Sequence, residues 1–249
     1  MKHKREVTPI VALVITIGLA NLPSPAQQLG PSTDLNNFAS VHELYAQGDY
    51  ESVVAIGERL LLIEAQTTNQ KDPQFSKLLL MIANSNRALG NANKAGFAYK
   101  RAISALETVD GRNRRLGAVL ERYACFLQRN GNKAEAYDVQ KRALAILAPS
   151  PEPSRRGPVT GTVVQGQRID ILQPNYPVQA RRNKISGSVS VVALIDETGK
   201  PLTACAESGD EVLAIAAEEI AFRARFTPTT LDDIPVRVNA QIVYKFVPK

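Results

Sequence analysis

The residues that could do chemistry are few, and their spacing forms no catalytic or metal-binding pattern. The histidines and cysteines of the chain are His3, His42, Cys125 and Cys205. The sequence has no His-Glu-x-x-His, nucleophile-elbow or phosphate-loop motif, and the cysteines lack a Cys-x-x-Cys spacing. We therefore expect a protein that is not an enzyme and that uses no cofactor or metal.

Adjacent acids are the remaining candidates for proton transfer. Glu218-Glu219 and Asp232-Asp233 are neighbours in the sequence, and we predict that both pairs are solvated surface charge. Cys125 lies in an apolar helical context and Cys205 in a different predicted domain. Two cysteines can pair in an oxidising compartment, but these separate contexts favour two independent buried thiols.

The composition and charge indicate a folded protein and give no sign of nucleic-acid binding. The 249 residues carry a formal charge of +6, with 44% hydrophobic and 22% charged residues. Such a composition supports a buried core. The positive excess is small and spread along the chain, so we expect no nucleic-acid partner.

The first 26 residues have the order of an export signal. A basic start at Lys2, Lys4 and Arg5 precedes an apolar stretch of about 14 residues, shorter than the roughly 20 that span a bilayer. Small residues at Ser24 and Ala26 suit a signal peptidase. We predict a signal peptide over 1–26 and a periplasmic mature chain. If it is not cleaved, the segment would instead anchor the chain in the inner membrane.

Residues 27–148 repeat at an interval of 41 residues. Gly90-Asn91 matches Gly131-Asn132, and Ala95 matches Ala136, while Gly48-Asp49 belongs to a weaker first copy. Self-similarity at this period is typical of stacked helical hairpins. The predicted helices cover 35–47, 50–66, 74–89, 92–108, 113–129 and 133–147. Their small-residue pattern resembles tetratricopeptide repeats, which implies a helical solenoid that binds an unidentified protein partner.

The sequence predicts a linker after the helices and strands after the linker. The prolines and arginines of residues 149–168 predict a linker, with a short strand over 160–164. Apolar residues alternate with others over 188–196 and 236–246, which predicts two strands that each bury one face. Gly199 suits a hairpin turn into another strand that ends near residue 207, and a helix is expected after Asp210.

Five short motifs run through this last third in a fixed order. They are Gln173-Pro174-Asn175-Tyr176-Pro177, Ile185-Ser186-Gly187, Ile195-Asp196 with Gly199, Ser208-Gly209, and Arg225-Phe226 with Pro228. Together they resemble the C-terminal domain of TonB, the periplasmic energy transducer. The resemblance implies a small α+β domain with an antiparallel sheet over 169–249.

The resemblance also implies a function. A TonB C-terminal domain binds the TonB-box peptide of outer-membrane receptors beside its last strand. The matching contact positions here are Gln173, Pro174, Tyr176, Pro177, Val238, Ala240, Gln241 and Ile242. The four residues of the first motif also fit a rigid elbow with a packed tyrosine, because proline forces the preceding residue into an extended conformation.

Two functions remain open at this stage. One is a TonB-like protein that couples receptor transport to the energy of the envelope. The other is a periplasmic scaffold whose helical repeats bind a partner without energy transduction.

Overall fold

The structure is a computed structural model, and it describes residues 37–67, 73–109, 113–148, 163–164, 169 and 173–247. The predicted signal peptide and most of the predicted linker lie outside these residues. Within the described ranges, no helix is both long and apolar enough to cross a membrane.

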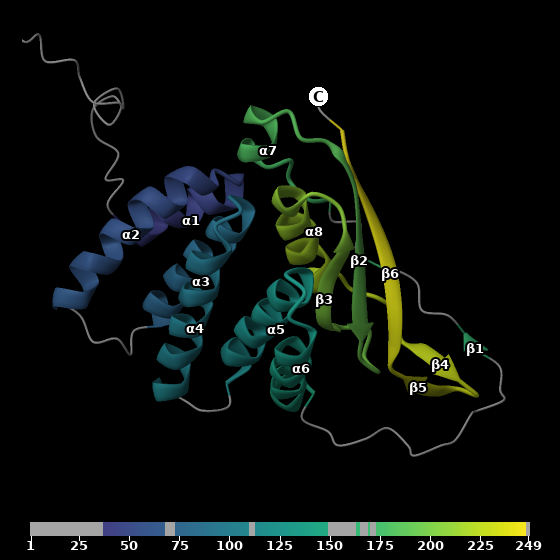
Figure 1. The fold of residues 1–249 in the computed structure, drawn as a ribbon. Coiled ribbons are helices and arrows are strands. Elements are labelled where there is room, and N and C mark those ends of the chain that lie inside the picture. Colours follow the sequence, from purple (N-terminus) through teal and green to yellow (C-terminus); the bar gives the residue numbers. More distant parts are fainter. Residues whose placement is uncertain are drawn as a thin grey trace, which may run out of the picture. The chain divides into compact units, whose positions relative to one another are not determined.

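Six of the described helices form the region before the predicted linker, and they run in adjacent pairs (Figure 1). They are α1 (Phe38–Gln47), α2 (Tyr50–Thr67), α3 (Pro73–Ala88), α4 (Ala92–Val109), α5 (Arg114–Arg129) and α6 (Lys133–Leu147). Every predicted helix is confirmed. The largest difference is at the start of α1, where the Asn37 side chain accepts the Ser40 N–H and caps the helix three residues later than predicted.

The same turn joins the two helices of each pair. Gly48, Gly90 and Gly131 all have positive φ, at 72°, 74° and 80°, which glycine adopts without steric cost. The matched small residues Ala95 and Ala136 are both buried, as a close approach of neighbouring helices requires. The helical region is therefore built from three similar hairpins.

The C-terminal part is a small antiparallel sheet with helices. Its elements are α7 (Val178–Arg182), β2 (Gly187–Ile195), β3 (Pro201–Ser208), α8 (Glu211–Arg223), β4 (Thr229–Leu231), β5 (Ile234–Val236) and β6 (Val238–Phe246). The main sheet has the order β3-β2-β6, and α8 lies across one face of it (Figure 1). This fold agrees with the predicted α+β class.

Local signals set the main sheet. Gly199 has a φ of 83°, and the Asp196 carboxylate accepts the N–H groups of Thr198 and Lys200, which closes the hairpin between β2 and β3. Val189 and Val191 turn fully buried side chains toward the core that α8 covers. The predicted burial of one face is thus confirmed in β2, where buried residues alternate with half-buried ones from Val189 to Ile195.

A second, small sheet was not predicted. It has the order β1-β4-β5, where β1 (Val163–Val164) is the described part of the short strand expected over 160–164. The turn between β4 and β5 places Asp232 and Asp233 at positive φ, which aspartate tolerates better than most residues. As a result, the last long strand begins at Val238 rather than at residue 236.

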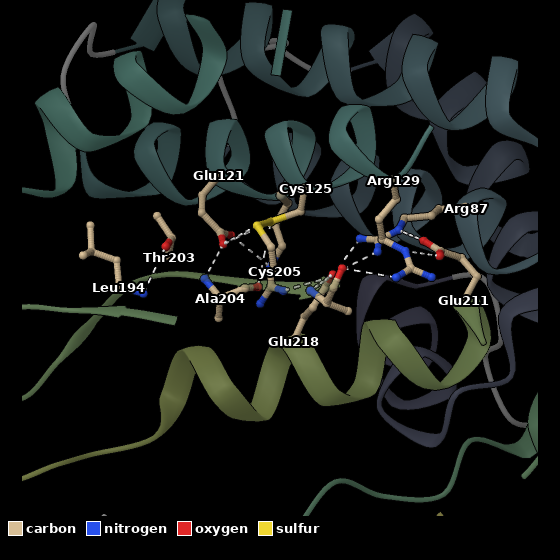
Figure 2. The surroundings of a disulfide bond; sticks show 12 residues. Arg87, Glu121, Cys125, Arg129, Leu194, Thr203, Ala204, Cys205, Glu211 and Glu218 are labelled. Atoms are coloured by element: carbon tan, nitrogen blue, oxygen red, sulfur yellow. Dashed lines mark hydrogen bonds and ion pairs between the residues drawn. A yellow bond between two sulfur atoms is a disulfide. The ribbon is translucent and has the colours of Figure 1, made fainter. Parts of the chain in front are cut away.

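The prediction of two independent thiols is wrong. Cys125 of α5 and Cys205 of β3 form a disulfide, with their Cα atoms 5.3 Å apart (Figure 2). The sequence alone did not show this contact, because the two cysteines are 80 residues apart and become adjacent only when β3 packs against α5. A disulfide suits the oxidising compartment that the predicted signal peptide implies.

Candidate peptide-binding site

One edge of the main sheet is closed by the side chains of acidic and basic residues. The N–H of Ala204 in β3 donates to the carboxyl group of Glu121 over 2.7 Å (Figure 2), and the N–H of Ala206 donates to that of Glu218 over 2.9 Å. The Arg129 guanidinium donates to the Ala206 carbonyl at 3.1 Å. These side chains take the place of a further strand, so the β3 edge has no room for one.

The contacts of β3 also fix the hydrogen-bond directions of the whole sheet. Because Ala204 and Ala206 donate away from β2, Cys205 between them turns its N–H toward Val192, its partner in β2. Val192 therefore bonds to β3, and its neighbour Ala193 bonds to the strand on the other side. That strand is β6, where Ala193 lies opposite Ala240.

In the part of the chain that the structure describes, no strand pairs with the outer side of β6, which forms the opposite edge of the sheet. Since Ala240 donates to β2, the next residue, Gln241, presents its N–H and C=O outward. The same alternation turns outward the main-chain groups of Asn239, Val243 and Lys245. Among the described residues, β6 pairs only with β2. The outward groups span about 20 Å from Asn239 to Lys245, enough for a peptide of about six residues.

Four of the eight predicted contact residues lie on β6, and they fall into two groups. Gln241 is the one member of the β6 set whose main chain faces outward, whereas Val238, Ala240 and Ile242 face β2. Sequence reasoning missed Asn239, Val243 and Lys245. Alternation alone could have grouped them with Gln241, but only the β3 contacts show which set faces outward.

The segment Gln173-Pro174-Asn175-Tyr176-Pro177 reaches the far end of β6. The Tyr176 hydroxyl donates to the Ile185 carbonyl at 2.5 Å, and its ring centroid lies 6.3 Å from that of Phe246. Gln173 is exposed and Pro174 is half-buried. Tyr176 is thus the packed tyrosine that the elbow interpretation expects, and it lies next to the last residue of the open strand.

Pro177 faces the helices instead. It is buried against Gly48, where a Cβ atom would lie 2.5 Å from the Cβ of Pro177. The next residues continue this contact: the Gln179 N–H donates to the Gly48 carbonyl at 3.0 Å, and Arg182 makes two hydrogen bonds to the Asp49 carboxylate. The elbow therefore holds the start of the C-terminal part on the turn between α1 and α2.

A buried ion network joins the same two parts of the chain elsewhere. Arg87 of α3 donates to both oxygens of Glu218 in α8, at 2.7 and 3.0 Å, and also contacts Glu211 (Figure 2). The predicted surface position of Glu218 is wrong, because its side chain is fully buried. Its neighbour Glu219 accepts a hydrogen bond from the Tyr45 hydroxyl. The second acid pair, Asp232 and Asp233, is exposed as predicted.

The pKa values of the two most deeply buried acids of the network, Glu121 and Glu218, are shifted in opposite directions. Burial raises the pKa of Glu121 to about 7, although Arg122 and the Ala204 N–H oppose the shift. Burial acts on Glu218 as well, but the Arg87 charge and its hydrogen bonds outweigh it and hold the pKa of Glu218 below its usual value. Glu121 also lies near the sulfurs of Cys125 and Cys205, but these are joined in the disulfide and offer a metal no thiolate.

Comparison with known proteins agrees with this description. Residues 172–248 match the model of the family described as Gram-negative bacterial TonB protein C-terminal. No curated protein matches the chain. The match covers the elbow, α7, α8 and the whole main sheet, including both of its edges. This part of the protein is therefore similar to TonB C-terminal domains, and the similarity indicates a TonB-like role in the bacterial envelope.

Proposed function

We propose that the protein is a periplasmic, TonB-like binding protein that holds the TonB-box peptide of outer-membrane receptors along β6 and so couples transport to the energy of the envelope. The open edge of β6 carries this proposal. It offers main-chain hydrogen bonds to an extended peptide, which is how strand addition supplies affinity. The family match and the disulfide support a periplasmic, non-enzymatic role.

Selectivity would come from the side chains beside that edge. Val243 is 57% exposed, and Lys245 and Gln241 lie on the same open face of the strand. At the far end, the half-buried Tyr176 ring packs beside the buried Phe246 and offers an aromatic contact. A bound peptide would place alternate side chains on these two features.

Two proline variants test the mode of binding. Ala240→Pro removes an N–H that donates to β2, so we expect the domain to unfold or to melt at a much lower temperature. Gln241→Pro removes an outward N–H, so the domain should stay folded while its affinity for a synthetic TonB-box peptide falls by about tenfold or more. Thermal melts and peptide titrations measure the two effects.

Gln241→Ala is the matched control. Like the proline variant, it loses the hydrogen bond from the Gln241 amide to the Ser190 hydroxyl, but it keeps the main-chain donor. We expect it to bind the peptide nearly as well as the parent. Equal binding by the parent and a folded Gln241→Pro variant would rule out strand addition at this edge.

The helical region supports a second candidate function. We infer that its three hairpins are tetratricopeptide-type repeats, since the glycine turns and small buried residues recur at one interval. A groove on these helices favours a scaffold that binds a partner through them without energy transduction.

A further inference from the structure

Two adjoining hollows lie on the helical region, away from β6. One has a volume of about 620 Å³ and is lined by residues of α3, α4 and α5. The other, of about 310 Å³, extends from α1 and α3 to α8 and to Pro177. Lys77 and Leu80 line both hollows, so the two adjoin at these residues, and we call them together the groove.

The floor of the groove is apolar. Leu106 and Val119 line the larger hollow, Met81 and Ile220 line the smaller one, and Leu80 lies between them. Covering such a floor with an apolar side chain is favourable, because it removes apolar surface from water. It would take a ligand that presents one apolar face.

The rim of the groove is basic, and its charges are unpaired. Lys77, Arg115 and Arg223 line the groove with exposed side chains, and no acid of the described ranges lies within ion-pair distance of them. Among the described residues that line the groove, Glu219 is the one acid, and it accepts the hydrogen bond of Tyr45.

Some exposed cations elsewhere on the helices have acidic partners. Lys94 pairs with Glu58, Lys100 with Glu135, and Arg142 with Glu107. What distinguishes the groove is that three cations without such a partner among the described residues gather beside one apolar floor. Unpaired cations around an apolar floor complement a ligand that carries acidic and apolar groups together.

We propose that this groove binds an extended segment of a partner protein in which acidic and apolar residues alternate. In an extended chain, alternate side chains point to opposite sides, so one set would cover the floor while the other meets the rim. The proposal adds a second binding surface to the one on β6 and does not depend on it. A protein with both would hold two partners at once.

A short fluorescein-labelled peptide in which leucine and aspartate alternate is a suitable probe. Fluorescence anisotropy with the full mature chain should show binding that weakens as salt is added. The double variant Lys77→Glu/Arg115→Glu should lower the affinity for this probe about tenfold or more. The control Arg59→Glu/Lys141→Glu changes the net charge equally at exposed positions that do not line the groove, and it should bind like the parent.

The TonB-box peptide separates this proposal from the one for β6. Unchanged binding of that peptide by Lys77→Glu/Arg115→Glu shows that the variant is folded and supports two separate surfaces. The inference is overturned if a probe with asparagine in place of aspartate binds equally, if the control pair weakens binding equally, or if the two peptides displace each other. Self-association of the chain that Lys77→Glu/Arg115→Glu abolishes would overturn the choice of a foreign partner and make a second copy the occupant.

Discussion

The two edges of the main sheet differ in whether their outward main-chain groups are bonded. At β3, the outward N–H groups of Ala204 and Ala206 are bonded to Glu121 and Glu218, and a disulfide holds the strand to α5. At β6, the outward groups around Gln241 meet no other strand among the described residues. An unpaired edge is a template for pairing with another chain, so native proteins usually cover it. Here one edge is covered and one is left open.

The difference shows what the helical region does for the C-terminal domain. Glu121, Arg129 and Cys125 all come from α5, and Arg87 comes from α3. The helices therefore close β3 and fix α8, so β6 is the edge at which an incoming peptide can pair. The polar side chains of Asn239, Gln241 and Lys245 on β6 discourage indiscriminate association, as polar and charged edge residues generally do.

The Arg87–Glu218 pair gives the largest expected effect. Arg87→Met leaves the Glu218 carboxylate buried without its partner, so the free energy of unfolding should fall by about 3–5 kcal/mol. Arg142→Met is the matched control, because the Arg142–Glu107 pair is about half exposed and should contribute only about 0–1 kcal/mol. Urea unfolding of the two variants measures both values.

A double variant sharpens this test. Glu218→Gln added to Arg87→Met removes the uncompensated charge and keeps an acceptor for the Ala206 N–H, so it should recover part of the lost stability. An Arg87→Met variant that is no less stable than Arg142→Met would show that the helices do not support the sheet through this network.

The disulfide should give the next largest effect. Replacing Cys125 and Cys205 together by alanine releases a loop of 80 residues, which should lower the free energy of unfolding by about 2–4 kcal/mol. Glu121 and Arg129 still cover β3 in this variant, so its affinity for a TonB-box peptide at β6 should not change. A loss of peptide binding in a folded double variant would contradict the independence of the two edges.

Much of the fold could be predicted because its signals are local. A glycine turn between two periodic apolar runs defines each helical hairpin, and the alternation before Gly199 defines β2. The turn at Asp232 and Asp233 was missed, since two acids at positive φ are an uncommon choice for a hairpin.

The closed edge could not be predicted, since it depends on contacts between distant segments. Glu218 and Glu219 are adjacent in the sequence, and nothing there shows that α8 places them against Arg87 and Tyr45. Likewise, Cys125 and Cys205 are separated by a predicted domain boundary. The residues of β6 that face outward are identified from the Glu121–Ala204 hydrogen bond, so the sequence alone could not show them either.

Glu121 gives the smallest of these effects, and the effect depends on pH. The pKa of this buried acid is about 7 in the folded protein, above the usual value of 4.5. Between those values the folded state holds a proton that the unfolded state has released. The free energy of unfolding should therefore fall by about 1–3 kcal/mol as the pH rises from 5 to 8. Glu218 has a lowered pKa, so its contribution changes only at lower pH.

Glu121→Gln should remove this dependence, because an amide copies the protonated acid and still accepts the Ala204 N–H. At pH 5 the variant should match the parent within about 1 kcal/mol, and at pH 8 it should be the more stable of the two. Glu207→Gln, at an exposed position of β3, is the control, and its stability should depend on pH as that of the parent does. Parallel curves for the parent and Glu121→Gln across pH 5–8 would mean that the acid is ionised throughout, and that a charged carboxylate closes the β3 edge.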